Sequence, residues 1–518
     1  MPVTVSRANK ALVVPPSPGA QSLFPNAPAL PDGNLIVPHG MRETLLLRHL
    51  GYKVPNPMLL YYDWCNGSPF HVQKLTCKLL SESAHAYVLN HMGTGKTKTA
   101  LWAWDFLNKA GLTKKLLVVA PLSTLHFVWA REVFGTLPGR KVQVLHGSKQ
   151  DRLDRLATDA DIYVINHDGL RVVVNELYTR PDITCLVIDE LAVYRNNSDR
   201  SKLMRKFATR FQIVWGMTGA PMPNEPTDVW AQAKIVTPNT VPKYQSHARD
   251  ILMTKKGPYT WVPKPDAVEK AFKMLQPSVR YGLDDVTELP QLTSRVFDVD
   301  LSPQQKQVYE KVRTELATMV SGEQITALNA GAAMNKLLQI AGGWVYSKAP
   351  DFVRLDASPR VAGLIDLVQS AERKVLCAVP YRHAIEGLGA IFTRLKVGFD
   401  FCMVHGNTTG RENLFHLFQN SDKFKLMLAH PGTVHHGLTL TAADTTIWYL
   451  PVPSLDIYDQ FNARFRRIGQ THKQQLIHMQ ATPIEKKLYS LLAKKARVQD
   501  MLLQLVEDAT ARRDGSVL

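Results

Sequence analysis

The sequence predicts an α/β protein of two lobes, each built on a parallel sheet. Between residues 86 and 219, six apolar runs of strand length alternate with amphipathic segments of helix length, such as 97–110. A second alternation, of five such runs, occupies 374–480. The segment between them differs, because 225–300 is rich in proline, lysine and polar residues and 303–341 has a helical pattern. Alternating strands and helices are typical of parallel sheets covered by helices on both faces.

The same pattern divides the 518 residues into five expected parts. They are a disordered or extended arm (1–40), a first α/β lobe (41–235), a helical insertion or linker region (236–345), a second α/β lobe (346–500) and a tail (501–518). The arm is expected because Pro, Ala and Val dominate it and no helical or strand period is present. Ser302 followed by Pro303 predicts the start of the central helix, as an N-cap and a first-turn proline.

The composition narrows the class of protein. The chain has 62 Lys and Arg against 45 Asp and Glu, which gives a net charge of +17. This charge is compatible with a polyanionic partner such as nucleic acid, but many basic proteins have no such partner. The hydrophobic share of 45% excludes a mostly disordered chain. No apolar run reaches the roughly 18 residues of a membrane span, and the first residues do not form a signal peptide. Five cysteines without a CxxC pair fit a reducing cytoplasm rather than a disulfide framework or a Cys-rich zinc site.

The most specific chemical pattern is NHMGTGKT at residues 90–97. A strand followed by a Gly-rich turn that opens a helix presents backbone N–H groups and a positive helix end to phosphates. The backbone of Gly93, Thr94 and Gly95 is therefore expected to bind a nucleotide. Lys96 is expected to reach its β- and γ-phosphates and Thr97 to ligate Mg²⁺. The usual pattern begins with glycine, whereas this chain has asparagine at that position.

A pair of acidic residues, Asp189 and Glu190, follows the apolar strand 185–188. Residues just past the carboxyl end of a parallel strand face the ligand crevice. Asp189 is expected to hold Mg²⁺ there, and Glu190 to polarise the water that attacks the γ-phosphate. With the phosphate loop, the pair predicts hydrolysis of a nucleoside triphosphate rather than binding alone.

Three residues of the second lobe, Gln460, Arg464 and Arg467, are spaced i, i+4 and i+7. On a helix they share one face, and the two guanidinium groups are candidates for arginine fingers that contact the γ-phosphate. A basic surface helix is the alternative.

The order and spacing of these motifs resemble superfamily-two helicases, and specifically the Swi/Snf-type, remodeller-like DNA translocases. HMGTGKT (91–97) is similar to motif I, and DELAVYRN (189–196) occupies the place of DEAHxxKN. TGAPMPNEPTDVW (218–230) is close to motif III. RFRRIGQ (464–470) resembles the signature RxHRIGQ and is the most specific match. The box reads DELA, with Ala192 where relatives carry a histidine that helps to link hydrolysis to nucleic-acid binding.

The resemblance implies two RecA-like lobes of a P-loop NTPase with helical insertions between them, and ATP with Mg²⁺ as cofactors. It implies that Gln73 reads the adenine, that Gln460 joins the nucleotide site, and that Lys96, Asp189, Glu190, Arg464 and Arg467 are catalytic. Nucleic-acid contacts are implied at Ser123, Thr124, His167, Thr439 and Thr441. Trp129 is expected to pack against helices rather than to stack on bases.

The expected function is that of an ATP-dependent DNA translocase or helicase, an ATP hydrolase that moves along or remodels DNA in replication, repair or recombination. Its partner is expected to be duplex or branched DNA, bound without sequence preference, with no membrane association. The chain is expected to be a monomer in the cytoplasm of a prokaryotic or phage-infected cell, a minimal form similar to those of phage and bacterial genomes. The alternatives are an RNA-acting helicase, a P-loop packaging or restriction-type DNA motor, and a DNA-binding scaffold with an inactive ATPase.

Overall fold

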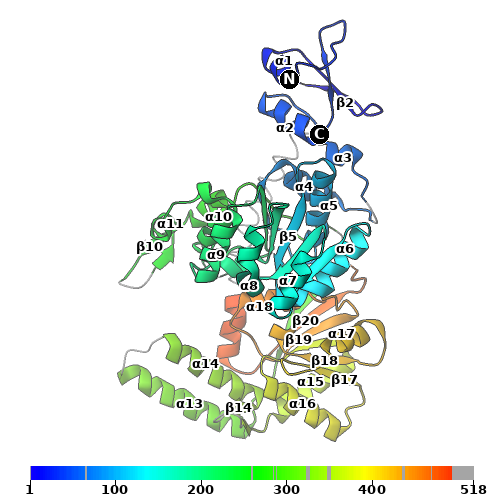
Figure 1. Ribbon diagram of the computed structural model, residues 1–518. Coiled ribbons are helices and arrows are strands. Elements are labelled where there is room, and N and C mark those ends of the chain that lie inside the picture. Colours follow the sequence, from blue (N-terminus) through cyan, green and yellow to red (C-terminus); the bar gives the residue numbers. More distant parts are fainter. Residues whose placement is uncertain are drawn as a thin grey trace. The chain divides into compact units, whose positions relative to one another are not determined.

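The computed structural model describes residues 2–492, apart from 65–66, 224, 258–260, 284, 287–288, 323–326, 347–351, 435–437 and 468 (Figure 1). The chain forms two compact units, Met1–Val286 and Thr287–Val498. No helix in the described residues is long and apolar enough to cross a membrane. The tail expected at 501–518 lies outside the described residues.

The first unit contains a seven-stranded sheet. Its strands are His85–Val88 (β4), Lys115–Ala120 (β5), Val142–Leu145 (β6), Ile162–Asn166 (β7), Ile183–Asp189 (β8), Ile213–Met217 (β9) and Ser278–Val279 (β12). They lie in the order β12-β4-β9-β8-β5-β7-β6, and every neighbouring pair is parallel. All six runs predicted between 86 and 219 are therefore strands of one parallel sheet.

Helices accompany this sheet in the alternation that the sequence predicts. They are Pro57–Tyr61 (α3), His71–Glu82 (α4), Lys96–Lys109 (α5), Arg131–Thr136 (α6), Lys149–Ala157 (α7), His167–Tyr178 (α8), Asp199–Ala208 (α9), Asp228–Val236 (α10), Gln245–Leu252 (α11) and Ala267–Met274 (α12). Short helical turns are Leu122–Thr124 (η1), the π-helical Leu125–Ala130 (η2), Leu191–Tyr194 (η3) and Pro238–Thr240 (η4). A separate hairpin pairs Met253–Lys255 (β10) with Trp261–Pro263 (β11).

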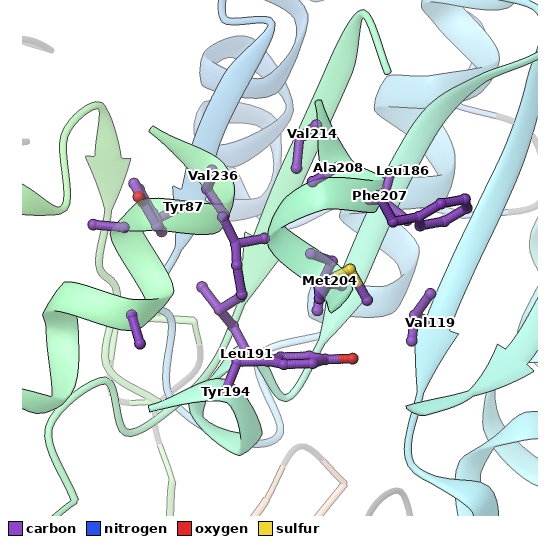
Figure 2. Close-up of a cluster of buried hydrophobic side chains, with 14 of the residues drawn as sticks. Tyr87, Val119, Leu186, Leu191, Tyr194, Met204, Phe207, Ala208, Val214 and Val236 are labelled. Atoms are coloured by element: carbon purple, nitrogen blue, oxygen red, sulfur yellow. The ribbon is translucent and has the colours of Figure 1, made fainter. Parts of the chain in front are cut away.

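One face of the sheet packs on a large hydrophobic core that α8, α9 and α10 cover. Figure 2 shows part of it, where Val119 of β5 and Leu186 of β8 lie near Met204 and Phe207 of α9. Tyr194, from the turn that follows β8, enters the same cluster. Each buried side chain of this size contributes about 1.5–3 kcal/mol, so the core fixes the strand ends and the turns that leave them.

The first 40 residues are not a disordered or extended arm, and that prediction is wrong. They form an antiparallel sheet of Thr4–Ser6 (β1), Ala11–Val14 (β2) and Leu35–Pro38 (β3) with the helix Pro18–Leu23 (α1), and the helix Met41–His49 (α2) follows. Leu12 and Val14, like Leu35 and Val37, alternate inward into a small core. The strand period is hidden because prolines interrupt these short runs. Tyr52 also enters this core, which is therefore completed beyond residue 40.

The second unit contains a six-stranded sheet. Its strands are Leu292–Asp298 (β13), Lys374–Ala378 (β16), Phe401–Val404 (β17), Leu426–Ala429 (β18), Ala443–Trp448 (β19) and Gln474–Gln480 (β20). Their order is β13-β20-β19-β16-β18-β17, again parallel throughout. A two-stranded hairpin joins Trp344–Tyr346 (β14) to Phe352–Arg354 (β15). The two parallel sheets confirm the predicted fold class.

Helices cover both faces of the second sheet (Figure 1). They are Ser358–Ser370 (α15), Arg382–Leu395 (α16), Arg411–Asn420 (α17) and Leu455–Asn462 (α18), with the turn Pro431–Thr433 (η5). In β16, Val375 and Cys377 face a core shared with α15 and α16, whereas Leu376 and Ala378 face a core shared with α17 and α18. This alternation is the period of two that a strand buried on both sides requires.

The segment expected to be an insertion, 236–345, contributes to both sheets. The helices Pro303–Gly322 (α13) and Ala327–Gly342 (α14) confirm its helical part, and the hydroxyl of Ser302 accepts the backbone N–H of Gln305 at 3.1 Å, as expected of an N-cap. However, β12 adds an edge strand to the first sheet and β13 adds one to the second. The two residues of β12 cannot establish an alternation, and the seven residues of β13 are half-buried or exposed along the strand, so neither forms a recognisable apolar run.

Candidate nucleotide and nucleic-acid sites

The candidate site residues of the first unit follow the carboxyl ends of neighbouring strands. Along the edge of the sheet, β4 leads into the phosphate loop, β9 to Thr218, β8 to Asp189 and Glu190, β5 to Ser123, and β7 to His167. Because all these strands are parallel, their carboxyl ends lie on one edge of the sheet. The fold therefore brings together residues that are far apart in the sequence.

The phosphate loop has the backbone that its glycines allow. Gly93 and Gly95 have φ of 84° and 83°, in the left-handed region that favours glycine, and α5 begins immediately afterwards, at Lys96. A Cβ at Gly95 would also meet Nε2 of Gln73, so a larger residue there would displace that amide. The helix start directs its backbone N–H groups at the loop, as a phosphate site requires.

Gln73 is buried and holds the loop from the side of α4. Its Oε1 accepts the backbone N–H of Phe70 at 3.1 Å, and its Nε2 donates to the carbonyl of Thr94 at 3.0 Å. In this structure the glutamine expected to read adenine thus connects the start of α4 to the phosphate loop.

Asn90 explains the departure from glycine at the first position of the pattern. Its side chain is 2% exposed and bridges two elements. Oδ1 accepts the backbone N–H of Tyr281 at 3.0 Å, and Nδ2 donates to the hydroxyl of Thr76 at 3.1 Å. Glycine could make neither bond. The asparagine side chain therefore anchors the start of the loop to α4 and to the segment after β12.

Lys96 lies over the loop, where its Nζ donates to the carbonyls of Asn90 at 2.9 Å and His91 at 3.2 Å. Its charge also stabilises the carboxylate of Asp189. The hydroxyl of Thr97, in the first turn of α5, and the carboxylate of Asp189 are hard oxygen donors of the kind that Mg²⁺ prefers. These residues fit the magnesium–nucleotide site that the sequence predicts.

The carboxylate of Asp189 is held at both oxygens. Oδ2 accepts the indole N–H of Trp129 at 2.9 Å, and Oδ1 accepts the backbone N–H of Glu190 at 3.1 Å. Burial raises the pKa of Asp189 above its ordinary value, whereas Trp129, Lys96 and the Glu190 backbone act in the opposite direction. Trp129 is buried, as expected, but its bond to Asp189 was not predicted, because sequence spacing gives no sign of a contact between residues 60 positions apart.

Glu190 turns away from the strand with an unusual backbone. Its φ of 56° and ψ of 55° place it in the left-handed region, which costs free energy in a residue other than glycine and is often found at functional sites. The hydroxyl of Thr218 donates to its Oε1 at 3.1 Å. Leu191 then enters the core (Figure 2). A Cβ at Gly216 would lie 2.6 Å from Cδ2 of Leu191. The core thus fixes the turn that carries the acidic pair.

In the second unit, the arginine segment is not the continuous helix that the spacing predicts. Helix α18 ends at Asn462, so Arg464 and Arg467 do not share a helical face with Gln460. Arg464 is 3% exposed and its Nε donates to the carbonyl of Gln460 at 2.8 Å, while Nη1 of Arg467 donates to the carbonyl of Leu438 at 2.7 Å.

The turn after α18 is organised by Gln470, a residue of the signature that was not singled out. Its Nε2 donates to the carbonyls of Thr441, Ala443 and Phe465 at 2.9–3.2 Å. The two N–H groups of this buried amide are shared among three carbonyls and hold the turn to the segment 441–443.

Two of the residues expected to contact nucleic acid, Thr439 and Thr441, lie beside this arginine segment. The backbone N–H of Leu440, between them, donates to the carbonyl of Arg464 at 3.0 Å. Thr439 is exposed, and the hydroxyl of Thr441 accepts Nε2 of Gln419 at 3.1 Å. The structure therefore groups these threonines with the arginines.

The other three expected contacts lie in the first unit and differ in exposure. Ser123 is half-buried in η1, whereas Thr124 is 1% exposed and its hydroxyl donates to the carbonyl of Pro121 at 2.8 Å. His167 is buried, and its Nδ1 lies 2.9 Å from the hydroxyl of Tyr194. Burial lowers the pKa of His167 to about 4, against the opposing effect of the Asp189 backbone, so the imidazole is neutral at pH 7.

A cleft of about 990 Å³ opens at His167, between the first turns of α8 and α9 and the turn η3. Its charged lining residues are Arg171, Arg195, Arg200, Asp168 and Asp199. Arg200 pairs with Asp168 at 2.5 Å, and Nη1 of Arg195 donates to the carbonyl of Ala192 in the DELA box. The lining therefore has a small excess of positive charge, three arginines against two aspartates, and we refer to it as the basic cleft; Arg195 connects it to the box.

The protein has two α/β units, each with a parallel sheet. In the first unit, the phosphate loop and the acidic pair lie on one edge of the sheet, an arrangement that defines a two-lobed P-loop nucleotide hydrolase. The model of the SNF2-related domain matches residues 73–342, and that of the helicase conserved C-terminal domain matches 359–469. The chain belongs to the SNF2-related family of superfamily-two helicases, and it is an ATP hydrolase. Both matches confirm the resemblance read from the motifs.

Similar proteins include those of phage, bacteria and eukaryotes. The chain is 26% identical over 440 residues to protein p41 of Acyrthosiphon pisum secondary endosymbiont phage 1, which covers 79% of this chain and 90% of that protein. It is 23% identical to the SWI/SNF-related matrix-associated actin-dependent regulator of chromatin subfamily A-like protein 1 of Xenopus laevis, over 76% of this chain but 39% of that protein. A solved SWI2/SNF2 ATPase core of Sulfolobus solfataricus in complex with dsDNA is 18% identical, covers 89% of this chain and 98% of that one, and has a TM-score of 0.41.

The anchoring of the phosphate loop by Asn90 can be tested with Asn90→Ala. We expect the free energy of unfolding to fall by about 1–3 kcal/mol, because the substitution leaves the buried N–H of Tyr281 and the hydroxyl of Thr76 without these partners. Urea unfolding measures the change, and ADP binding reports on the loop. The control is Gln150→Ala, which removes an exposed bond to Asp154. Equal stability of the two variants would contradict the anchoring role.

Proposed function

We propose that the chain is an ATP-dependent DNA translocase or helicase, which couples ATP hydrolysis to movement along DNA or remodelling of it. The observation that carries the proposal is the direct connection between the basic cleft and the acidic pair. His167 opens the cleft and bonds Tyr194, and Tyr194 ends the turn that begins just after Glu190. A ligand that shifts α8 or α9 therefore acts on the residues proposed for hydrolysis.

For the hydrolysis itself, we assign each residue of the first sheet edge a role. The loop backbone at Gly93, Thr94 and Gly95 binds the phosphates, and Lys96 moves from the loop carbonyls to the β- and γ-phosphates. Thr97 and Asp189 would hold Mg²⁺, which supplies charge neutralisation at the phosphates when bound. Glu190, held by Thr218, orients the attacking water and accepts its proton.

From the second unit, we assign Arg467 to the γ-phosphate, where a guanidinium group stabilises the charge of the transition state. Arg464 is the more buried of the two arginines, and its bond to the carbonyl of Gln460 supports the segment that carries Arg467. Gln460 and Arg464 remain proposed members of the nucleotide site.

Three findings support DNA as the polymer. The net charge is +17, the cleft lining is basic, and the names of several relatives place them on chromatin. Contacts to the phosphate backbone suit a motor that moves over any sequence. We propose that the DNA backbone passes near five residues, Ser123, Thr124, His167, Thr439 and Thr441. Because Thr124 and His167 are buried, we propose that they support the exposed residues of this surface. We also propose that the DNA is duplex or branched, and that the chain acts as a monomer in the cytoplasm of a prokaryotic or phage-infected cell.

The nucleotide site can be tested with Lys96→Ala and Glu190→Gln. Each is expected to lower ATP turnover by at least about 100-fold, because the first removes the phosphate-binding charge and the second the proton acceptor. Steady-state phosphate release measures turnover. Lys273→Ala and Glu269→Gln, which remove an exposed ion pair of α12, are the matched controls. Undiminished turnover in Lys96→Ala or Glu190→Gln would refute the assignment of the site.

The role of the second unit can be tested with Arg467→Ala. We expect kcat to fall by about a thousandfold or more while the Kd for ATP changes little, because an arginine finger acts on the transition state. Single-turnover kinetics and equilibrium ATP binding separate the two effects. Arg313→Ala removes an exposed arginine of the same unit and is the control. Weakened ATP binding with an unchanged kcat would contradict the finger role.

The polymer can be identified from stimulation of the ATPase by duplex DNA, single-stranded DNA and RNA. We expect duplex DNA to stimulate most, with an apparent affinity that falls by about a thousandfold between about 50 and about 200 mM salt. Arg171→Glu in the cleft is expected to weaken the affinity by about 10-fold, because it reverses a charge that faces the phosphates. Lys206→Glu, exposed on α9 but outside the cleft lining, is the control. Stimulation by RNA alone would favour the RNA-acting alternative.

A further inference from the structure

Trp129 differs from three other buried tryptophans of the first unit, Trp104, Trp215 and Trp230, in what its indole N–H contacts. Trp104, Trp215 and Trp230 each donate to a backbone carbonyl, at 2.9–3.0 Å. Trp129 donates at 2.9 Å to a carboxylate oxygen, Oδ2 of Asp189. A buried indole N–H usually has a hydrogen-bond partner, and a backbone carbonyl is sufficient in these three cases, so packing alone does not account for the carboxylate.

The bond fixes how the Asp189 carboxylate is turned. Trp129 is fully buried, so its ring has little freedom, and its N–H holds Oδ2 while the N–H of Glu190 holds Oδ1. Each carboxylate oxygen accepts more than one bond, so both retain a lone pair for a further ligand. Groups that orient a metal ligand in this way commonly change metal affinity when they are removed.

The element that carries Trp129 also leads to the segment proposed to meet nucleic acid. Ser123 and Thr124 lie in η1, and η2 continues directly from it to Trp129. The η2 turn is π-helical, a rare conformation that is often associated with functional sites. Strand β5 precedes the segment with Trp129, and its parallel neighbour β8 ends at Asp189. A shift of η1 and η2 therefore reaches the carboxylate through one side chain.

From these contacts we propose that Trp129 is a positioning residue that orients the Asp189 carboxylate for the metal of the bound nucleotide and connects it to the segment 122–130. The inference rests on the proposed function, because it takes Asp189 as the metal ligand. It assigns this chain a direct connection between that segment and the acidic pair.

The test compares Trp129→Phe with Trp104→Phe. Both remove one buried indole N–H from the first unit, but that of Trp104 donates to a backbone carbonyl, that of Lys114. Mn²⁺ in place of Mg²⁺ is titrated against each protein with ADP and followed by electron paramagnetic resonance. ADP binding is also measured in excess chelator, without metal. Trp129→Phe is expected to weaken Mn²⁺ binding by about 10-fold and to leave metal-free ADP binding unchanged, whereas Trp104→Phe changes neither.

A second variant addresses the possibility that phenylalanine disturbs the packing. Replacing Trp129 by 3-benzothienylalanine keeps the size and shape of the ring and removes only the N–H, so it is expected to give the same loss of Mn²⁺ affinity. The ratio of DNA-stimulated to basal turnover is expected to fall in both Trp129 variants and to hold in Trp104→Phe.

Two outcomes separate this inference from the proposed function. If Asp189→Ala loses Mn²⁺ binding but both Trp129 variants bind Mn²⁺ as Trp104→Phe does, the positioning role is refuted and the metal site stands. If Asp189→Ala binds Mn²⁺ as well as the unmodified protein, the assignment of Asp189 as metal ligand is refuted, and the positioning role with it.

Discussion

The parallel pairing of β4, β9, β8, β5 and β7 is the constraint on which the candidate site of the first unit depends. Hydrogen bonding in one direction places all five carboxyl ends on one edge, and the turns that leave them carry the phosphate loop, the acidic pair and the start of the basic cleft. Side-chain bonds then join neighbouring turns, from Thr218 to Glu190 and from Trp129 to Asp189. Backbone pairing creates the proximity, and these few polar contacts set the geometry.

The sequence predicts most of the fold because the central strands are apolar runs, and several of them are followed by an amphipathic helix. Two predictions are wrong, the arm at residues 1–40 and the helix through Arg464 and Arg467. The alternation of Leu12 with Val14 and of Leu35 with Val37 was too brief to register among prolines, so a folded region was read as a disordered arm. The arginine spacing fits a helix, yet the bonds of Gln470 favour a turn after Asn462, and local periodicity does not record such bonds.

The candidate residues themselves were found from the sequence where a motif is contiguous, as in the phosphate loop and the acidic pair. The supporting contacts could not be found in this way. Asn90 looked like a departure from the usual pattern until its partners, Thr76 and Tyr281, were known. Trp129 looked like a core residue, and its burial is indeed complete, but the choice of partner for its N–H depends on how β5 and β8 pair.

The bond between Asn90 and Tyr281 has a consequence for the order in which the protein folds. The two residues are 191 positions apart, and Arg280 beside them donates to the carbonyls of Leu89 and Gly219. A nascent chain therefore cannot complete its phosphate loop when the loop leaves the ribosome, but only after residue 281 has emerged. Contacts of such long range form late in folding, because the intervening loop entropy must first be overcome. A shortened fragment that ends before 281 would contain every residue of the loop and lack the contacts that hold its first residue.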